Sequence, residues 1–291
     1  MKTPDISVII LSFNTEDLTL ACLRSVMDSQ LGSLTMEVIL VDNASSDATV
    51  KEVRAVFPSV NIIENKTNAG FAKGNNIGMH VAKGRYMLLL NSDTEVDPDA
   101  IRDVCIDMEK RPRAGAMTCT LVLTDGSMDP ACHRGFPTPW ASFTYFTKLE
   151  ALFPKSTFFG AYHQGYKQMT VPHQVDAISG AFCMVRRETI EEVGYLDEAF
   201  FMYGEDLDWA YRMKEKGWEI WFDPDTTTLH RKKKSGRSHG DKKRRMVNDI
   251  LFYDTMKLFY KKHYEKKYSW ILTACIFGLL DMRIWMIKHS V

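Results

Sequence analysis

An apolar run that stops abruptly in polar residues, at positions 86–93, limits the folds open to this chain more than any other stretch. Tyr86 to Leu90 are large and apolar without alternation, which is typical of a strand buried on both faces of a sheet. Asp93 follows at the rim where open α/β sheets bind ligands, and its carboxylate suits Mg²⁺ or Mn²⁺. The alternative is a strand followed by a polar turn.

The same pattern occurs three times earlier in the chain. Buried strands are predicted at 6–14, 36–42 and 60–64, with helices between them. This alternation implies parallel strands, right-handed crossovers and an α/β fold. Three of the four strands end in a polar residue, namely Asn14, Asp42 and Asp93. Because parallel strands end at one rim of a sheet, we expect these residues to form a site.

The glycine-rich stretch at 68–76 opens the helix before the strand at 86–90. It is not a G-x-G-x-x-G fingerprint, and no G-x-x-x-x-G-K-[ST] loop occurs in the sequence. Dinucleotide-binding and P-loop sites therefore lose their support. A nucleotide held by its base and ribose near Asp42, with its phosphates toward Asp93, is still open.

After residue 115 the regular alternation ends. Strands are predicted at 116–123 and 175–186. Residues 133–172 between them are rich in aromatic residues, proline and glycine, and they show no clear periodicity. A stretch of this length is usually a functional loop, so we interpret it as a lid. The alternative is a locally packed excursion.

Three acidic residues, Glu205, Asp206 and Asp208, lie where the helix ending near Lys216 begins. A helix N-terminus favours ionised acids, but three acids exceed what capping needs. We predict that Asp206 faces a pocket as a general base, while Glu205 and Asp208 orient its neighbours. His230 follows the next strand, and a lone histidine is more often structural than ligating.

The overall composition excludes little. Lys and Arg balance Asp and Glu at 37 each, so net charge names no partner, and we expect no nucleic-acid partner. None of the six cysteines forms a C-x-x-C pair, which favours buried free thiols in a reducing cytosol. The N-terminus leads directly into a strand without a signal-peptide core, so we expect a cytoplasmic protein.

Eight short stretches form a further pattern: Val8–Asn14, Val41–Asp47, Asn68–Ala72, Leu89–Asp93, Ser179–Ala181, Gly194–Phe201, Gly204–Trp209 and His230. In this order and spacing they resemble the family 2 glycosyltransferases, and within them the rhamnosyltransferase-like bacterial enzymes. The resemblance covers about residues 6–235. Each stretch is weak alone, but together they are highly specific.

The resemblance implies a GT-A fold over residues 1–235, with a Rossmann-like, mostly parallel central sheet flanked by helices. The nucleotide-binding half would cover about 1–115 and the acceptor-side half about 116–235. It also implies an inverting enzyme that moves a sugar from a UDP-, GDP- or dTDP-sugar. The acceptor would be a hydroxyl of a glycan or lipid-linked molecule in cell-surface polysaccharide synthesis.

Carried over residue by residue, the resemblance makes Asp93 the metal-binding acid and His230 a second contact to the metal or diphosphate. Asp206 would be the catalytic base. The implied donor contacts are Ser12, Asn14, Asp42, Asn43, Asn68, Gly70, Asn75, Asn91 and Ser92. Asn91 departs from the family's D-x-D motif, which has an acid there. A single-carboxylate site for Mg²⁺ or Mn²⁺ that borrows phosphate oxygens and water is chemically reasonable.

Two other functions compete with glycosyl transfer. A nucleotidyltransferase can share a similar sheet and metal acid, but it should carry a glycine-rich, basic loop near the first strand. Residues 12–17 are acidic instead. A catalytically silent nucleotide-sugar-binding module is favoured only by Asn91, and the intact Glu205-Asp206 pair argues against it.

Residues 236–291 are expected to form a basic and apolar helical extension. The segment 231–267 holds 14 Lys and Arg against 4 Asp and Glu. Residues 270–287 are strongly apolar but contain Asp281 and Arg283, so no stretch offers the roughly 20 clean apolar residues that span a bilayer. We expect a helix in the membrane interface, on the inner face of the cell membrane. The alternative is a helical pair that packs on the catalytic domain or holds a homo-oligomer together.

Overall fold

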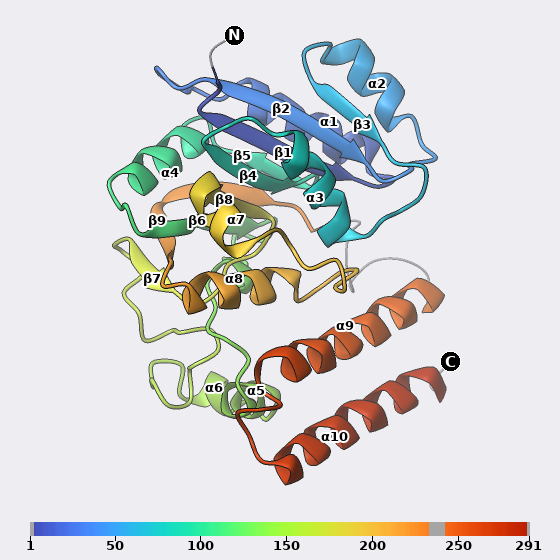
Figure 1. Cartoon of the computed structure of the whole chain (residues 1–291), viewed down its shortest axis with the longest axis vertical. Coiled ribbons are helices and arrows are strands. Elements are labelled where there is room, and N and C mark those ends of the chain that lie inside the picture. The colour runs from blue at the N-terminus through green and yellow to red at the C-terminus, as the bar shows by residue number, and fades with distance from the viewer. Residues whose placement is uncertain (1–2, 233–241, 290–291) are drawn as a thin grey trace.

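The computed structural model describes residues 3–232 and 242–289 (Figure 1). The predicted domain boundary at 235, and the basic residues Lys233 and Lys234, lie outside the described residues. Nine strands of the described chain form one mixed sheet flanked by helices. The strands are β1 Ile6–Ser12, β2 Met36–Asp42, β3 Asn61–Glu64, β4 Tyr86–Asn91, β5 Thr94–Val96, β6 Ala114–Leu123, β7 His173–Val175, β8 Phe182–Arg186 and β9 Glu219–His230.

Helices connect these strands and follow the last of them. They are α1 Glu16–Met27, α2 Thr49–Val56, α3 Phe71–Val81, α4 Ala100–Glu109, α5 Pro139–Phe146, α6 Leu149–Leu152, α7 Arg187–Val193, α8 Glu205–Glu215, α9 Lys242–His263 and α10 Trp270–His289. A short 3-10 helix covers Pro130–Cys132.

The strands β1 to β4 run parallel, as the alternation of strand and helix predicts. The sheet order is β3-β2-β1-β4-β8-β6-β9-β5, with β7 paired to β9. β1 lies between β2 and β4, and in register Ser12 is opposite Asp42 while Leu11 is opposite Asn91. The apolar side chains of β4 are buried, which explains why this strand carries no polar alternation.

The second half of the sheet mixes strand directions. β8 runs antiparallel to β4 and β6, and β9 runs parallel to β6 but antiparallel to β5 and β7. The single strand predicted at 175–186 is wrong. Its first part, β7, pairs with β9, whereas its last part, β8, pairs with β4 and β6, so the chain must cross between them. Ala177 in this crossing forms an isolated bridge with Arg134.

The short strand β5 positions residues of the candidate site. It follows Asp93 directly, where the sequence shows no strand pattern, and it pairs with β9 so that Thr94 lies opposite His230. This pairing brings Asp93 and His230 together from distant parts of the chain.

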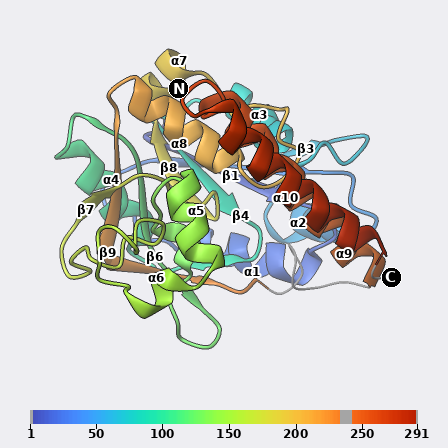
Figure 2. The same ribbon diagram turned by 90° about the horizontal axis from the view of Figure 1, so that it is seen from below.

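The segment 133–172 contains two helices, α5 and α6. Thr138 caps α5 by accepting a hydrogen bond from the Ala141 amide at 3.1 Å, and Pro139 occupies its first turn. Both helices lie at the same end of the molecule as α10 (Figures 1 and 2). The lid role of this segment stays a prediction.

The C-terminal extension is a helical hairpin, in which α10 runs back alongside α9 (Figures 1 and 2). Phe259 and Tyr260 of α9, and Tyr264 just after it, share a buried cluster with Phe200, and Phe136 packs against it. The extension therefore packs on the rest of the chain, as one of the two alternatives predicts.

By length and composition alone, α10 is long and apolar enough to cross a membrane. This differs from the expectation that no stretch of the chain meets that condition. The helix continues through Asp281 and Arg283, and α9 supplies a partner for each of them. Asp281 pairs with Lys257, and Arg283 Nε donates a hydrogen bond to the hydroxyl of Tyr253 at 3.3 Å. Only 11% of the most apolar window of α10 is buried within the protein.

Candidate active site

The polar ends of β1, β2 and β4 meet at one rim of the sheet because the three strands are parallel neighbours. Asn14 leaves β1 with a φ of 54°, a left-handed conformation that asparagine tolerates. Its side-chain oxygen accepts hydrogen bonds from the amide and hydroxyl of Ser46, at 2.7 and 3.1 Å. Asn14 thus ties the turn after β1 to the turn after β2.

Asp42 has an oxygen that suits a ligand. The residue is 3% exposed, and its Oδ2 accepts a hydrogen bond from the Ser45 amide at 2.9 Å. Its Oδ1 is buried and has no hydrogen-bond partner among the described residues. Asp42 also lines an open hollow of about 830 Å³, together with Ser45, Arg54 and Asn65. Because an unpartnered buried oxygen is costly, a hydrogen-bond donor on a ligand fits here.

The side chain of Asn43, just after β2, bonds to Asn68 and Gly70 in the loop before α3. The Asn43 side-chain amide donates to Asn68 Oδ1 at 3.3 Å and to the Gly70 carbonyl at 3.0 Å. The Asn43 oxygen accepts a hydrogen bond from Asn65 at 2.8 Å. Gly70 has a φ of +82°, and a β-carbon there would lie 2.5 Å from the carbonyl oxygen of Phe201, so the position requires glycine.

Ser12 and Ser92 belong to a buried hydroxyl cluster beneath the rim. Ser12 Oγ lies 3.1 Å from the hydroxyl of Thr15 and 2.9 Å from that of Thr19, and Ser92 Oγ lies 3.1 Å from Thr15. These hydroxyls bond to one another across β1, α1 and the end of β4. The structure therefore uses both side chains as scaffold, and their contact with a donor stays a prediction.

Asn75 and Asn91 lie apart from this cluster. Asn75 is buried in α3, where its side-chain amide donates to the carbonyl of Phe71 at 3.0 Å. Asn91 is half-buried at the last position of β4, and its backbone N–H donates to the carbonyl of Ala181 at 3.1 Å. Their predicted contacts with a donor also stay predictions.

Asp93 and His230 form a buried pair at the rim. His230 Nε2 lies 3.3 Å from Asp93 Oδ1, and its Nδ1 lies 2.8 Å from Asp129 Oδ2. Lys232 Nζ lies 2.8 Å from the other oxygen of Asp129. Burial opposes protonation of the imidazole, but the carboxylates of Asp129 and Asp93 outweigh it and raise the pKa of His230.

Asp93 and His230 fit a shared divalent cation. Two adjacent ligands of an octahedral ion, each about 2.1 Å from it, lie about 3 Å apart, close to the 3.3 Å between Asp93 Oδ1 and His230 Nε2. In the described part of the chain, no three His, Cys, Asp or Glu side chains are grouped to hold a metal. Phosphate and water oxygens would have to complete the shell, as in a nucleotide-bound Mg²⁺ or Mn²⁺.

Asp206 lies in the first turn of α8, where Arg134 holds its carboxylate. Asp206 Oδ2 accepts a hydrogen bond from Arg134 at 2.6 Å, and Oδ1 accepts one from the Leu207 amide at 2.8 Å. Arg134 also donates to the carbonyl of Ile178 at 3.2 Å. Both charged side chains are mostly buried, so the ion pair fixes the direction of the carboxylate. A fixed carboxylate can accept a proton from a hydroxyl placed beside it.

Glu205, next to Asp206, has the opposite environment. It is buried, and its Oε2 has no hydrogen-bond partner within residues 3–232 and 242–289. Burial and the neighbouring charge of Asp206 raise the pKa of Glu205 to about 8. This shift favours the protonated form of Glu205 over the carboxylate.

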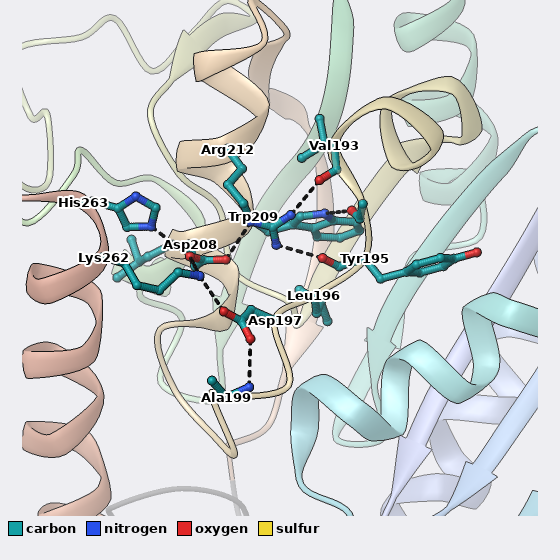
Figure 3. Close-up of polar contacts among 12 residues, drawn as sticks. Val193, Tyr195, Leu196, Asp197, Ala199, Asp208, Trp209, Arg212, Lys262 and His263 are labelled. Atoms are coloured by element: carbon teal, nitrogen blue, oxygen red, sulfur yellow. Dashed lines mark hydrogen bonds and ion pairs between the residues drawn. The ribbon is translucent and has the colours of Figure 1, made fainter.

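Asp208 is the centre of an ion-pair network that connects α8 to α9 (Figure 3). Its buried carboxylate accepts hydrogen bonds from Arg212 Nε at 2.8 Å, Lys262 Nζ at 2.5 Å and His263 Nε2 at 2.8 Å. Lys262 also bonds Asp197 at 2.5 Å. These contacts agree with the prediction that Asp208 orients its neighbours.

A comparison with known protein families decides the class of this site. The model of the glycosyl transferase family 2 matches residues 7–194, which is more than half of the chain. The chain belongs to glycosyl transferase family 2. It is therefore a glycosyltransferase, which leaves the nucleotidyltransferase and the silent binding module without support.

Relatives of this glycosyltransferase have names that refer to sugar transfer or to glycan biosynthesis. It is 28% identical over 211 residues to the N-acetylglucosaminyl-diphospho-decaprenol L-rhamnosyltransferase of Mycobacterium tuberculosis (strain CDC 1551 / Oshkosh), covering 68% of this chain and 67% of the relative. It is 32% identical over 136 residues to the succinoglycan biosynthesis protein ExoO of Rhizobium meliloti (strain 1021), covering 46% of this chain and 38% of the relative.

Solved structures of other glycosyltransferases share the GT-A fold. The mannosyltransferase PcManGT from Pyrobaculum calidifontis, in complex with GDP-Man and Mn²⁺, aligns with a TM-score of 0.62 at 16% identity, over 100% of this chain and 71% of its own. S. aureus TarS 1-349 in complex with UDP-GlcNAc aligns with a TM-score of 0.60 at 16% identity, over 98% of this chain and 73% of its own. The predicted GT-A fold is confirmed.

The candidate site residues His230 and Asp206 have two partners that the sequence patterns did not indicate, Asp129 and Arg134. Asp129 is fully buried against His230, and Arg134 holds Asp206. Both lie after β6, where no motif occurs. The available signal was weak: a charged residue in an apolar, aromatic stretch needs a partner of opposite charge.

Proposed function

We propose that this enzyme is an inverting glycosyltransferase that moves a sugar from a nucleotide-diphosphate sugar to a hydroxyl of a lipid-linked or glycan acceptor. The observation that carries the proposal is the buried Asp93–His230 pair, 3.3 Å apart, at the same sheet rim as the unpartnered oxygen of Asp42. This arrangement suits a ligand with a hydrogen-bonding base or ribose at one end and a diphosphate at the other. PcManGT with GDP-Man and TarS with UDP-GlcNAc, which share the fold, support a donor of this class.

On the donor side, Asp42 would accept a hydrogen bond from the base or ribose, and the turns tied by Asn14 would shape the pocket. Asp93 and His230 would hold Mg²⁺ or Mn²⁺, with Asp129 fixing the ring of His230 through Nδ1. When bound, such an ion offsets the negative charge that develops on the leaving diphosphate. The remaining predicted donor contacts would act mainly by holding the loops in place.

On the acceptor side, the Asp206 carboxylate would take the proton of the acceptor hydroxyl as its oxygen attacks the anomeric carbon. The bond from this carbon to the diphosphate oxygen breaks, and the nucleoside diphosphate leaves with the electron pair. Attack from the face opposite the leaving group inverts the anomeric configuration. Arg134 keeps Asp206 directed at the acceptor and compensates its charge.

We also propose that the acceptor is lipid-linked and that the enzyme works on the inner face of the cell membrane, in cell-surface polysaccharide synthesis. The name of the mycobacterial relative includes a diphospho-decaprenol acceptor, and the two proteins are 28% identical. The weakly buried, apolar α10 supports contact with a membrane.

A thermal-shift screen over UDP-, GDP- and dTDP-sugars, with and without Mn²⁺, tests the donor proposal. The matching donor should raise the melting temperature by mass action, and Mn²⁺ should enlarge the shift. Asp42→Ala should lose the shift, whereas a free sugar without nucleotide should give none in either protein. No shift with any nucleotide sugar in the presence of Mn²⁺ would contradict the proposal.

A further inference from the structure

The outer face of α10 is apolar. Ile276, Leu280 and Ile284 lie on its inner side, in the cluster shared with α9. The outer side carries exposed large residues, namely Trp270, Ile271, Leu279, Met282 and Trp285. A surface helix of a soluble protein normally has polar residues on its outer face. We therefore expect an apolar partner or environment to contact the outer face of α10.

A second apolar surface lies on residues 139–159, which we call the aromatic cap. Its exposed large residues are Trp140, Phe143, Tyr145, Phe146, Leu152, Phe153 and Phe158. The ring of Trp140 lies 4.6 Å from that of Phe158 and 5.5 Å from that of Phe143, measured between centroids. These rings thus pack against one another at the surface instead of inserting into the main core. Leu152 is 71% exposed and is the most exposed of these side chains.

The aromatic cap and α10 lie at the same end of the molecule, at the bottom of Figure 1, and both face the viewer in Figure 2, which is seen from below. Phe136 lies just before the cap in the sequence. It packs in the cluster that α9 forms with Phe200, and its ring lies 4.9 Å from that of Tyr211 on α8. Two segments far apart in the sequence therefore expose apolar side chains at one end of the protein.

Charges around these surfaces favour a lipid bilayer over a second protein. Lys148 and Lys155 are exposed within the cap, and Lys261 and Lys266 are exposed near the turn between α9 and α10. Interfaces between proteins are depleted in lysine. Lysines beside Trp, Phe and Leu are typical of surfaces that lie in the interface of an anionic membrane.

We propose that the aromatic cap and the outer face of α10 form one surface that lies in the interface of an anionic lipid bilayer. This inference rests on the proposed function for its purpose, which is access to a lipid-linked acceptor. The cap begins shortly after Arg134, which holds Asp206, and α9 is bound to Asp208 by Lys262 and His263 (Figure 3). Membrane contact through both segments would keep the proposed base near the lipid headgroups.

Site-specific fluorescent labels test the two halves of the surface separately. Cys275 on α10 is exposed, whereas the other five cysteines are buried, so a polarity-sensitive label reacts mainly there. The cap is labelled in Cys275→Ser with Leu152→Cys, and a control in Cys275→Ser with Val81→Cys, on the exposed side of α3. With vesicles of phosphatidylcholine and phosphatidylglycerol, labels at 275 and 152 should shift to the blue, and the label at 81 should not. No shift at 152 would overturn the proposal.

Co-sedimentation with the same vesicles tests the contribution of the cap to binding. Phe146→Gln with Leu152→Gln and Phe158→Gln should weaken binding by about tenfold or more, because three apolar side chains leave the interface. The matched control replaces exposed apolar residues elsewhere, Met27→Gln with Val81→Gln and Ile106→Gln, and should bind like the wild type. Equal binding by the cap variant and the wild type would overturn the proposal.

Two further measurements on the cap variant separate the outcomes. An unchanged melting temperature and an unchanged shift with the nucleotide sugar show that it is folded and binds donor, so a loss of vesicle binding is then specific. A wild type that binds donor but no vesicles overturns the membrane surface and leaves the proposed function intact. Light scattering that finds a wild-type dimer, lost in the cap variant, together with no vesicle binding, assigns the surface to a second copy of the chain instead.

Discussion

Four acids around the candidate site differ in the partners that surround them. Burial alone would raise the pKa of Asp129, Asp208 and Glu205. For Asp129, hydrogen bonds from His230 and Lys232 outweigh burial and lower its pKa. For Asp208, hydrogen bonds from His263 and Lys262, together with the charge of Arg212, lower the pKa to about 2. Asp206 has Arg134. Glu205 has no cationic side chain bonded to it in the described structure, and its pKa is raised to about 8. The direction of the pKa shift of Asp129, Asp208 and Glu205 thus follows from the presence or absence of a bonded cationic partner.

Glu205→Gln should stabilise the protein at pH 8 but not at pH 4.5. The unfolded chain loses the Glu205 proton near its ordinary pKa of 4.5, whereas the folded protein keeps it until about pH 8. The wild type therefore loses stability as pH rises through this window, and glutamine has no proton to lose. We expect a gain on the order of 1–3 kcal/mol in the free energy of unfolding at pH 8. Urea unfolding at both pH values measures it.

The control for this experiment is Glu188→Gln, at an exposed position of α7. It should change stability equally little at both pH values. If Glu205→Gln also has the same effect at pH 4.5 and pH 8, the pKa of Glu205 is not raised.

Asp93→Asn should remove the part of donor binding that depends on the metal. The amide keeps the shape of the side chain but loses the charge that attracts a cation beside the diphosphate. Calorimetry with the donor identified by the thermal-shift screen should show a loss of more than about tenfold in affinity with Mn²⁺, and little change without it. Asp97→Asn, at an exposed position just after β5, should keep the effect of Mn²⁺. Full Mn²⁺-dependent binding by Asp93→Asn would rule out its metal role.

The helix α8 is held from two sides. Arg212 donates to the carbonyls of Val193 and Tyr195 at 2.9 and 2.8 Å, and Trp209 Nε1 donates to that of Gly194 at 2.8 Å (Figure 3). From the other side, Lys262 and His263 of α9 bond to the carboxylate of Asp208. The first turn of α8, which carries Asp206, is therefore fixed by the loop after α7 and by the C-terminal hairpin.

Asp208→Asn should destabilise the protein by about 3–5 kcal/mol, because it removes the fully buried carboxylate that Arg212, Lys262 and His263 share. The control variant Asp254→Asn, at an exposed position of α9, should change the free energy of unfolding little. The low pKa of Asp208 means that its contribution is present above the ordinary pKa near 3.8 and disappears as pH falls toward 2. Chemical unfolding at neutral pH compares the two variants. Equal stability of Asp208→Asn and the wild type would show that the network does not hold the hairpin.

The parallel half of the sheet could be predicted because its strands are continuous apolar runs, each readable from local sequence. Asp42 and Asp93 could be placed for the same reason, since each directly follows such a run. The strand β5 and the break between β7 and β8 could not be predicted. They depend on pairing with β9, which lies far along the chain.

Partners of the site residues were also beyond the reach of local patterns. Asp129 lies beside His230, and Arg134 lies beside Asp206, only because the strands and crossings bring them there. By length and composition, α10 also differs from the expectation that no stretch could span a bilayer. Its two charged residues looked like an interruption, but α9 supplies a partner for each of them.

In the molecule as a whole, donor binding and proton transfer have separate supports. The proposed donor contacts and Asp93 lie on the parallel strands and their loops. The proposed base lies on α8, which the C-terminal hairpin and the segment after β6 hold in place. A change in the base should therefore alter turnover without altering the binding of the nucleotide sugar.

Asp206→Asn puts this separation to the test, because asparagine keeps the shape of the side chain and cannot take up the proton. Donor affinity is measured by calorimetry, and the release of nucleoside diphosphate is measured with an acceptor that supports wild-type turnover. We expect unchanged donor affinity and a rate lower by about 10²–10⁴-fold. Asp225→Asn, at an exposed position of β9, should keep both values. Near wild-type release by Asp206→Asn, with donor binding intact, would show that Asp206 is not the base.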